Sequence, residues 1–366
     1  MSIEILDSTL REGEQSPGVN FTPEQRVEIA IALDEIGVEY IEAGHPSVSE
    51  DVFRGIKDVV EQGLKANILV HSRAKREDID MVLRTEAPWI GMFFCVSSHC
   101  LKMRFGITLE EAKRRIVDTI EYAKAHGLKI RFTPEDTTRT EWENLANVLE
   151  ILRELKVDRV SVADTTGVAH PVEFYNLVKK VAKYGVAVHV HCHNDLGLAF
   201  ANALMGIEAG AIVVDTTVNG IGERCGIVDL AQMATIARYR YGKKYKLDKL
   251  YLLSKRIEEI TGIAVEKHHP IVGEHAFVHK AGLHVAAVVK DPSFYEFMPA
   301  EMFGRERKIY VDKYAGRATV EYYLNRAGLK NGKVVKELLA RIKSSGRVYT
   351  PAMLVEEARK IEREVI

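Results

Sequence analysis

Two histidines separated by a single residue could bind one metal ion. His191 and His193 lie in the stretch VHVHCHND, residues 188–195, in which β-branched residues alternate with His and Cys. That alternation predicts a strand, and residues two apart on a strand face the same side. The two imidazoles would then point together at the end of the strand, which suits a divalent metal. Ordinary strand histidines are the alternative, and the rest of the chain must decide.

A carboxylate would complete such a site. Glu12 is the expected third ligand, with Asp7 as the runner-up. Two histidines and one carboxylate leave coordination positions open for substrate and water. Mg or Mn is favoured, with Co and Zn as alternatives, and the ion would act as a Lewis acid on the carbonyl of a bound 2-oxo acid. Arg11 could stabilise the alkoxide that forms when a nucleophile adds to that carbonyl.

Alternating strand and helix patterns must position these residues. The expected strands are 3–6, 40–43, 66–70, 89–96, 129–132, 159–163, 188–193 and 212–215. The helix after the first strand is expected to start at Thr22, with Pro23 in its first turn, and to stop near Gly37. Eight strand-helix units predict an α/β fold, a (β/α)8 TIM barrel. A doubly wound sheet is the alternative, but the first strand lacks the glycine-rich fingerprint that such folds usually carry.

Residues able to do chemistry follow most of the expected strands. They are Asp7, Arg11, Glu12, Glu42, His71, Arg131, Thr133, Asp164, Thr165, His191, His193 and Asn219. Barrel enzymes place their chemistry at these strand ends, so one shared site is favoured over a set of solvated loop residues. The glycine-rich stretch 219–226 could hold a phosphate or a carboxylate, although glycine-rich turns are common.

The pattern changes after the barrel. Residues 1–245 are expected to form the catalytic barrel, 246–300 a linker and lid, and 301–366 a small helical C-terminal subdomain. The lid part should contain a helix over 250–261 and an irregular segment over 268–282. We expect the part after residue 246 to be amphipathic and to have no core of its own.

Composition excludes several classes of protein. The net charge of the 366-residue chain is −1, so no nucleic-acid partner is implied. Its four cysteines show no disulfide or zinc-ribbon spacing, which suits a reducing, cytoplasmic setting. We expect neither a signal peptide nor a membrane span.

Four motifs resemble the acyl-CoA condensing branch of the metal-dependent aldolase barrels, the alpha-isopropylmalate synthase/homocitrate synthase family. They are DSTLREGEQSPG (7–18), HCHNDLG (191–197), NGIGER (219–224) and HKAGLH (279–284). The resemblance covers residues 7 to about 310, with the motifs in the family's order, and it is specific at the level of the family.

The resemblance implies a role for each candidate residue. The metal ligands would be Glu12, His191 and His193, and the 2-oxo acid would contact Arg11, His71, Arg131, Thr133 and Thr165. His284 would be the general base that removes a proton from the methyl group of acetyl-CoA, assisted by Glu135. His71 and Thr133 are expected to donate hydrogen bonds to the same distal carboxylate as Arg131. The family also implies a homodimer in which His284 reaches the barrel of the partner chain.

Two activities compete within the family. One condenses acetyl-CoA with 2-oxoglutarate to homocitrate and CoA, the first step of the alpha-aminoadipate route of lysine biosynthesis; the other uses 2-oxoisovalerate and gives 2-isopropylmalate. Glu12, where the second group usually has Asp, and the stretch RFTPED at 131–136 resemble the first group. Thr133 departs from relatives that have Ser but keeps the hydroxyl. The lack of a long allosteric domain also fits the first group. A non-catalytic metal-binding barrel is the alternative from another class.

Overall fold

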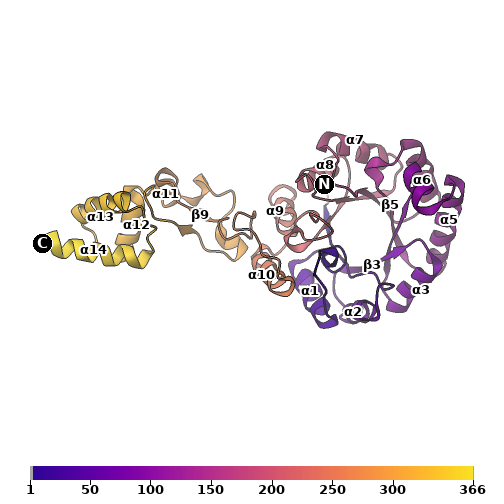
Figure 1. The fold of residues 1–366 in the computed structure, drawn as a ribbon, viewed down its shortest axis with the longest axis horizontal. Helices are drawn as coiled ribbons and strands as arrows, with labels where there is room; N and C mark the ends of the chain where they lie inside the picture. The colour runs from indigo at the N-terminus through magenta and orange to yellow at the C-terminus, as the bar shows by residue number, and fades with distance from the viewer. Residues whose placement is uncertain (1–2, 366) are drawn as a thin grey trace. The chain divides into compact units, whose positions relative to one another are not determined.

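The computed structural model describes residues 3–365 and confirms the expected barrel. Within those residues, eight parallel strands close a barrel in sequence order, surrounded by helices (Figure 1). The strands are β1 (Glu4–Asp7), β2 (Tyr40–Glu42), β3 (Asn67–Arg73), β4 (Trp89–Cys95), β5 (Lys129–Glu135), β6 (Arg159–Asp164), β7 (Ala187–Cys192) and β8 (Val213–Thr216). The long helices that follow them are α1 (Pro23–Ile36), α2 (Glu50–Glu61), α3 (Arg76–Thr85), α5 (Leu109–Ala125), α6 (Trp142–Glu154), α7 (Pro171–Ala182), α8 (Ala199–Glu208) and α9 (Leu230–Tyr241).

The ends of α1 show why Thr22 and Gly37 predicted the limits of this helix. Thr22 accepts a hydrogen bond from the backbone N–H of Gln25, and the Gln25 side chain accepts one from the backbone N–H of Thr22. This capping box satisfies amide groups that the first helical turn leaves unpaired. Gly37 ends the helix with φ 99°, a left-handed conformation that glycine adopts without strain. The predicted start and stop of this helix are confirmed.

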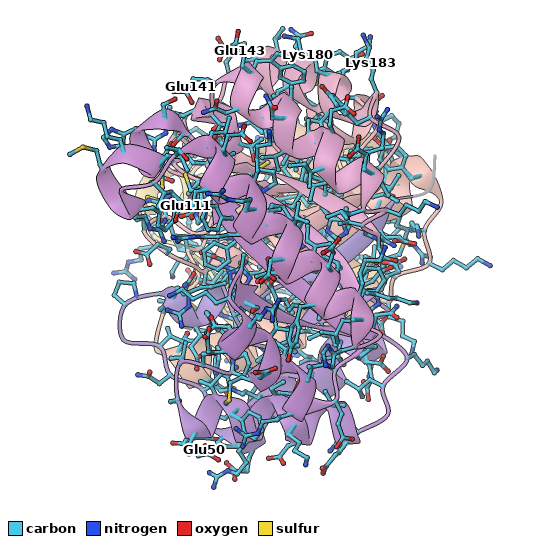
Figure 2. All side chains as sticks on the ribbon, turned by 90° about the vertical axis from the view of Figure 1, so that its right-hand side faces the viewer. Glu50, Glu111, Glu141, Glu143, Lys180 and Lys183 are labelled. Carbon is cyan, nitrogen blue, oxygen red and sulfur yellow. The ribbon has the colours of Figure 1, made fainter. Side chains whose placement is uncertain are left out.

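The helices bury one apolar stripe and expose charge on the other side. In α5 the buried residues include Ala112, Ile116 and Ile120, which are four residues apart and lie on one face. Figure 2 shows charged side chains on the outer surface, among them Glu111 in α5 and Lys180 in α7. No helix in the described part of the chain is long and apolar enough to cross a membrane.

The register of the strands sets residues of the pocket at equal heights. His71 of β3 pairs with Gly91 of β4, and Gly91 pairs with Arg131 of β5. Side chains at equal heights in neighbouring parallel strands face the same side of the sheet. Nearer the strand starts, the barrel is filled by a buried cluster of Leu6, Tyr40, Leu69, Trp89 and Val213. The apolar cluster thus lies below the polar layers that form the pocket.

A short helical segment after β4 was not predicted from the sequence. α4 (Ser98–Cys100) begins where the side chain of Ser97 accepts a hydrogen bond from the backbone N–H of Cys100, at 3.2 Å. A π-helical turn, Leu101–Phe105, continues it and ends at Gly106. This segment brings Arg104 to the pocket.

Contacts divide the chain into two compact units, one up to Ala264 and one from Val265. α10 (Leu250–Thr261) belongs to the first unit. The elements of the second are β9 (Val278–His279), α11 (Gly282–Val288), β10 (Lys308–Ile309), α12 (Arg317–Arg326), α13 (Gly332–Ser345) and α14 (Pro351–Val365). The expected domain limits at 245 and 300 stay a prediction.

The second unit has a hydrophobic core, so the expectation that the tail lacks one is wrong. The buried residues of this core are Val311, Ala315, Val320, Leu324, Val334, Val335, Leu338, Ile342, Leu354, Ala358 and Ile361. They come mainly from α12, α13 and α14, whose apolar positions recur at helical spacing. β9 and β10 form a parallel pair in segments where no strand was expected.

Candidate active site

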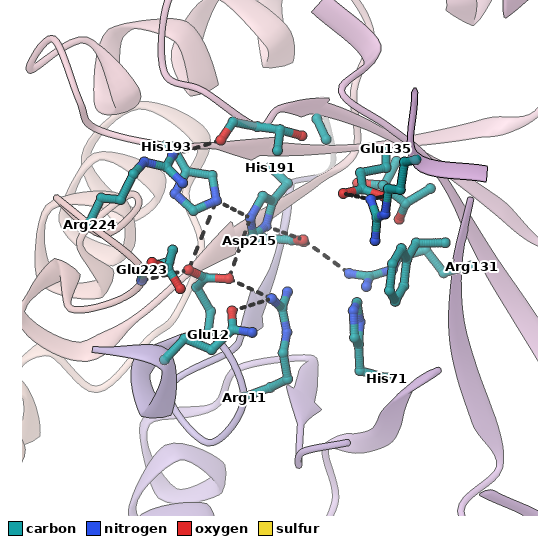
Figure 3. A pocket seen from close by; sticks show the side chains of 17 residues that line it. Arg11, Glu12, His71, Arg131, Glu135, His191, His193, Asp215, Glu223 and Arg224 are labelled. Carbon is teal, nitrogen blue, oxygen red and sulfur yellow. Dashed lines mark hydrogen bonds and ion pairs between the residues drawn. The ribbon is translucent and has the colours of Figure 1, made fainter. Parts of the chain in front are cut away.

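A cavity of about 300 Å³ lies at the carboxyl-terminal end of the barrel strands (Figure 3). Of the residues to which the family resemblance gives a role, those that line it are Arg11, Glu12, His71, Arg131, Thr133, Glu135, Thr165, His191 and His193. They come from five strands, β1, β3, β5, β6 and β7, or from the turns that follow them. The remaining candidate, His284, lies in α11 of the second unit.

Glu12, His191 and His193 form the one group of three potential metal ligands found within residues 3–365. Their ligand atoms all lie within 4.8 Å of one another. The Nε2 atoms of the two histidines are 3.3 Å apart, and they lie 4.0 and 3.9 Å from the two oxygens of Glu12. Two lone pairs that face each other at this distance repel unless a proton or a cation lies between them. Two imidazole nitrogens and a carboxylate oxygen are a donor set that fits a divalent metal.

The protonation states of these residues suit metal ligands. His191 Nδ1 is 3.1 Å from Asp215 Oδ2. An ionised carboxylate only accepts, so Nδ1 carries a hydrogen, and in the neutral tautomer of this ring Nε2 is the nitrogen that has a lone pair for a metal. Burial, aided by His191, lowers the pKa of His193 to about 4, which leaves this ring neutral at pH 7. Burial also opposes the charge on Glu12, but Arg11 and the other neighbouring groups together outweigh burial and lower the pKa of that carboxyl.

Asp7, the runner-up ligand, has other partners. Its oxygens accept hydrogen bonds from the backbone N–H of Thr9, at 2.9 Å, and from the hydroxyl of Thr216, at 3.2 Å. Burial raises the pKa of Asp7 to about 7. A carboxyl that is half protonated near neutral pH is a poor metal ligand, because a ligand must give up its proton. The structure therefore groups Glu12, rather than Asp7, with the histidines.

Glu42, to which the sequence analysis assigned no specific role, accepts hydrogen bonds from several side chains on the other side of the pocket. It accepts hydrogen bonds from Arg11 Nε at 2.7 Å, from Arg131 Nη2 at 2.7 Å and from His71 Nδ1 at 3.1 Å. Burial alone would raise the pKa of this carboxyl, but Arg11 and Arg131 outweigh burial and hold the pKa well below its usual value. Glu42 therefore stays ionised and orients the side chains that donate to it, which also include the Ser8 hydroxyl.

His71 differs from the donor that the sequence suggested. Burial, together with Arg11, lowers its pKa to about 4, so the ring is neutral. Its Nδ1 faces the ionised Glu42 and must carry the hydrogen. Nε2 is then a hydrogen-bond acceptor, and it cannot donate to a substrate carboxylate in this state. The ring also stacks on Phe93 at 4.8 Å between centroids, which fixes its plane.

Arg131 is held in the barrel interior. Its side chain is 2% exposed, and its two terminal nitrogens donate to Glu42 and to Asp215 Oδ2, the latter at 3.0 Å. A guanidinium has five N–H donors, so hydrogens remain on these nitrogens for a ligand. Gly91 provides the space, because a Cβ at that position would lie 2.8 Å from Arg131 Nη2. A larger residue at position 91 would displace the guanidinium.

The mouth of the pocket is also held by ion pairs. Arg104 Nη1 donates to both carboxylate oxygens of Glu135, at 2.9 Å each. Arg224 forms hydrogen bonds to Asp195 and to the backbone carbonyl of Thr165, with distances of 2.7 to 2.9 Å. The Thr165 hydroxyl accepts from the backbone of the β5–α6 loop at 2.9 Å, which leaves its own hydrogen to donate.

His284 has a very different environment. It is exposed at the surface of the second unit, and its ring stacks on Tyr295 with 4.1 Å between centroids. Leu283 beside it is 85% exposed, and Phe294, Tyr295 and Phe297 are each at least half exposed. A cluster of large exposed apolar side chains often marks a surface that binds another protein.

Sequence reasoning missed two kinds of residue. The strand-end rule selected Glu42 without giving it a role, and it could have selected Asp215 of β8 in the same way. Their function as acceptors for several donors at once depends on contacts between residues far apart in sequence. No sequence pattern pointed to Arg104, because nothing in the segment around it predicts the π-helical turn that carries it.

The family comparisons agree with the barrel fold. Residues 2–257 match the family described as HMGL-like, and residues 271–349 match the homocitrate synthase post-HMGL domain-like family. Among solved structures, the HMG-CoA lyase of Bacillus subtilis has a TM-score of 0.63 at 20% identity, covering 72% of this chain and 95% of that chain. The HMG-CoA lyase of Brucella melitensis has a TM-score of 0.61 at 21% identity, with 72% and 99% covered. These likenesses support the fold.

Curated relatives are similar over the full length. The homocitrate synthase of Pyrococcus abyssi is 64% identical over 98% of this chain and 99% of its own, and that of Pyrococcus horikoshii is 63% identical with the same coverage. The homocitrate synthase of Sulfurisphaera tokodaii is 46% identical over all of this chain and 82% of its own. With both family matches in sequence order, the chain belongs to the homocitrate synthase family of HMGL-like barrel enzymes.

Proposed function

We propose that the chain condenses acetyl-CoA with 2-oxoglutarate and water to give homocitrate and CoA. The observation that carries this proposal is one pocket in which a Glu-His-His group adjoins a buried, carboxylate-braced arginine. The first feature suits a chelating 2-oxo acid, and the second suits the distal carboxylate that distinguishes 2-oxoglutarate from a branched oxo acid.

The metal would be held by Glu12, His191 and His193. When bound, a divalent ion would supply Lewis-acid polarisation of the oxo-acid carbonyl. We propose Mg or Mn as the ion, with Co or Zn as alternatives. The chain's own contribution is a pocket in which burial keeps His193 neutral at pH 7 and the carboxylate of Glu12 is charged.

Substrate binding would use the cationic side of the pocket, the side that carries Arg11 and Arg131. Arg131 would bind the distal carboxylate of the oxo acid, and Thr133 and Thr165 would donate hydrogen bonds from their hydroxyls. Arg11 lies beside Glu12, 2.5 Å from its carboxylate, so its charge would stabilise the oxygen that becomes an alkoxide. His71 would accept a hydrogen bond through Nε2, from water or from the hydroxyl of the product.

The chemical steps need a base that is placed near the methyl group of acetyl-CoA. We assign this role to His284, assisted by Glu135. His284 would take a methyl proton, and the resulting carbon would form a bond to the carbonyl carbon of the oxo acid. The former carbonyl oxygen takes a proton, and water then cleaves the thioester and releases CoA. Stacking on Tyr295 would limit the rotation of the base.

We further propose a cytoplasmic homodimer in which His284 acts in the barrel of the partner chain. The support is the exposed apolar surface around His284, which includes Leu283 and Phe294. Such a surface is costly to leave in water and suits an interface. Acetyl-CoA and 2-oxoglutarate would be the small-molecule partners.

A screen of 2-oxo acids tests the activity. Free thiol released from acetyl-CoA should appear with 2-oxoglutarate, with kcat/KM about 10³-fold above that for 2-oxoisovalerate, because the branched acid leaves Arg131 unpaired. A preference for 2-oxoisovalerate would replace the proposal with 2-isopropylmalate synthesis. No thiol release with any oxo acid would favour a non-catalytic metal-binding barrel.

Arg131→Ala tests the basis of this specificity. We expect kcat/KM for 2-oxoglutarate to fall by about 10²–10³-fold while Mn²⁺ still binds. The change also strands two buried carboxylates and can cost ~3–5 kcal/mol of stability, so Arg131→Lys, which keeps the charge but loses the planar fork, accompanies it. Arg153→Ala on the outer surface of α6 is the control. Unchanged kcat/KM in both position-131 variants would exclude Arg131 as the determinant.

A further inference from the structure

One carboxylate connects the two halves of the pocket. Asp215, fully buried in β8, accepts hydrogen bonds at Oδ2 from His191 Nδ1, at 3.1 Å, and from Arg131 Nη1, at 3.0 Å. His191 belongs to the metal-ligand group, and Arg131 to the cationic side. Because both donors meet the same oxygen, rotation of the Asp215 carboxylate would displace the ligand histidine and the arginine together.

The other oxygen of Asp215 is fixed by residues nearer the amino-terminal end of the barrel. His189 Nδ1 lies 3.4 Å from Asp215 Oδ1, and Arg159 Nη1 lies 3.4 Å from His189 Nε2. An arginine can only donate, so His189 accepts at Nε2 and donates to Asp215 through Nδ1.

Arg159 is itself fixed at the amino-terminal end of the barrel. It donates to Glu4 at 3.0 Å and to the hydroxyl of Tyr40, and its guanidinium lies over the rings of Tyr40 and Trp89, at 4.7 and 5.5 Å from their centroids. Glu4 and Arg159 are the first residues of β1 and β6. A polar column therefore runs along the barrel interior from the strand starts to the pocket.

We propose that Asp215 is a positioning residue that couples the orientation of His191 to that of Arg131, and that His189 and Arg159 fix its carboxylate from the amino-terminal end of the barrel. The part that concerns oxo-acid binding rests on the proposed function; the part that concerns metal affinity does not. Asp215 is not assigned contact with substrate. It acts by holding one tautomer of His191 and one rotamer of Arg131.

Asp215→Asn tests the central residue. The amide has the shape of the carboxylate but only one oxygen that can accept hydrogen bonds, where the carboxylate has two. Its NH₂ group would face one of the N–H donors that the second carboxylate oxygen accepted from. We expect the dissociation constant for Mn²⁺, measured without substrate by equilibrium dialysis, to rise about 10–100-fold, the range for a group that orients a metal ligand. KM for 2-oxoglutarate should rise as well, with a smaller effect on KM for acetyl-CoA.

Asp7→Asn is the matched control for Asp215→Asn. Asp7 is also a fully buried barrel carboxyl, but its hydrogen-bond donors are Thr9 and Thr216 rather than a candidate ligand. The Mn²⁺ dissociation constant of this variant should stay within about two-fold of the wild type, because no ligand loses its acceptor. A folded Asp215→Asn protein with wild-type affinity for Mn²⁺ would overturn the proposal.

Variants of His189 test the column even where Asp215→Asn fails to fold. His189→Gln can donate to Asp215 and accept from Arg159, whereas His189→Leu can do neither. We expect His189→Leu to weaken Mn²⁺ binding and to raise KM for 2-oxoglutarate, and His189→Gln to restore much of both. Equal loss of thermal stability in the two variants with equal, wild-type Mn²⁺ affinity would show a merely structural role and would refute the column.

The Mn²⁺ measurements separate this proposal from the proposed function. If the wild type used no 2-oxoglutarate, the proposed activity would fail, yet the comparison of Mn²⁺ affinities would still decide whether Asp215 positions His191. Conversely, normal turnover in the wild type with no change of affinity in Asp215→Asn would leave the activity in place and remove the coupling.

Discussion

The pocket of the barrel and the surface around His284 represent opposite ways to present functional side chains. In the barrel, Glu42 and Asp215 are buried and each accepts hydrogen bonds from several side chains, so the orientation of Arg131 is fixed within one unit. His284 is exposed and packs against Tyr295. The second unit nevertheless has a core of its own, so its exposed surface stands on a packed support.

The barrel residues are preorganised for a ligand, whereas His284 must be brought to its place of action. Interlocked buried charges hold a geometry before any ligand arrives, because rotating one side chain would break several ionic hydrogen bonds in a medium of low dielectric constant. An exposed histidine on an apolar surface has no such constraint and gains one only when another surface covers it. The comparison predicts that barrel variants affect metal and oxo-acid binding, whereas variants near His284 affect the proton-transfer step.

Removal of a metal ligand should have the largest effect. Glu12→Ala and His193→Ala each delete one of the three grouped ligand atoms. We expect both to abolish turnover and to raise the Mn²⁺ dissociation constant by more than about 100-fold, beyond the range for residues that only orient a ligand. Metal content after dialysis and thiol release measure the two effects. Wild-type metal content and turnover in both variants would remove the assignment.

A mixing experiment tests whether the two regions come from different chains. Glu12→Ala leaves His284 intact, and His284→Ala leaves the barrel intact. With delivery between subunits, each mixed dimer has one complete site, so random exchange should restore about one quarter of wild-type activity. His284→Ala alone should retain Mn²⁺ affinity, which separates delivery from metal binding. Exchange of subunits without returned activity, shown with tagged chains, would place His284 in its own chain's barrel.

The independent core of the second unit predicts a local loss of stability. Leu338 is fully buried in that core. Leu338→Ala should reduce stability by about 2–5 kcal/mol through a cavity, and limited proteolysis should then cleave residues 265–366 first. Val348→Ala, at a position that is 55% exposed, is the control. Mn²⁺ affinity should not change in either variant; a parallel loss would mean that the barrel site depends on this core.

The effect predicted for Asp7 is confined to the pH dependence of stability. Burial raises the pKa of its carboxyl from 3.8 to about 7, so the folded state binds this proton more tightly than the unfolded state. Its contribution to stability is therefore complete below about pH 4 and is lost as the pH rises toward 7. Asp7→Asn should remove this loss and gain a few kcal/mol relative to the wild type between about pH 4 and 8. Denaturant unfolding of the wild type and of Asp7→Asn at several pH values measures the difference in stability. If the stability of the two proteins changed with pH in parallel, the prediction would be contradicted.

Local patterns were enough to predict the barrel. Thr22, Pro23 and Gly37 marked the ends of one helix, and strand-helix alternation gave the eight units. The strand-end rule also selected eight of the seventeen residues that line the pocket, because parallel strands in a barrel all end at the same face. It did not predict the strands β9 and β10, which are two residues each and have too little sequence to carry a pattern.

The sequence by itself determined which residue types stand at the barrel rim, since the periods of strand and helix are local properties of the chain. The tertiary structure alone decided what those residues contact. Glu42 and Asp215 became shared acceptors, the ring of His71 became an acceptor at Nε2, and the tail acquired a core. The physical reason is that hydrogen bonding, burial and the resulting pKa values depend on neighbours that are distant in sequence.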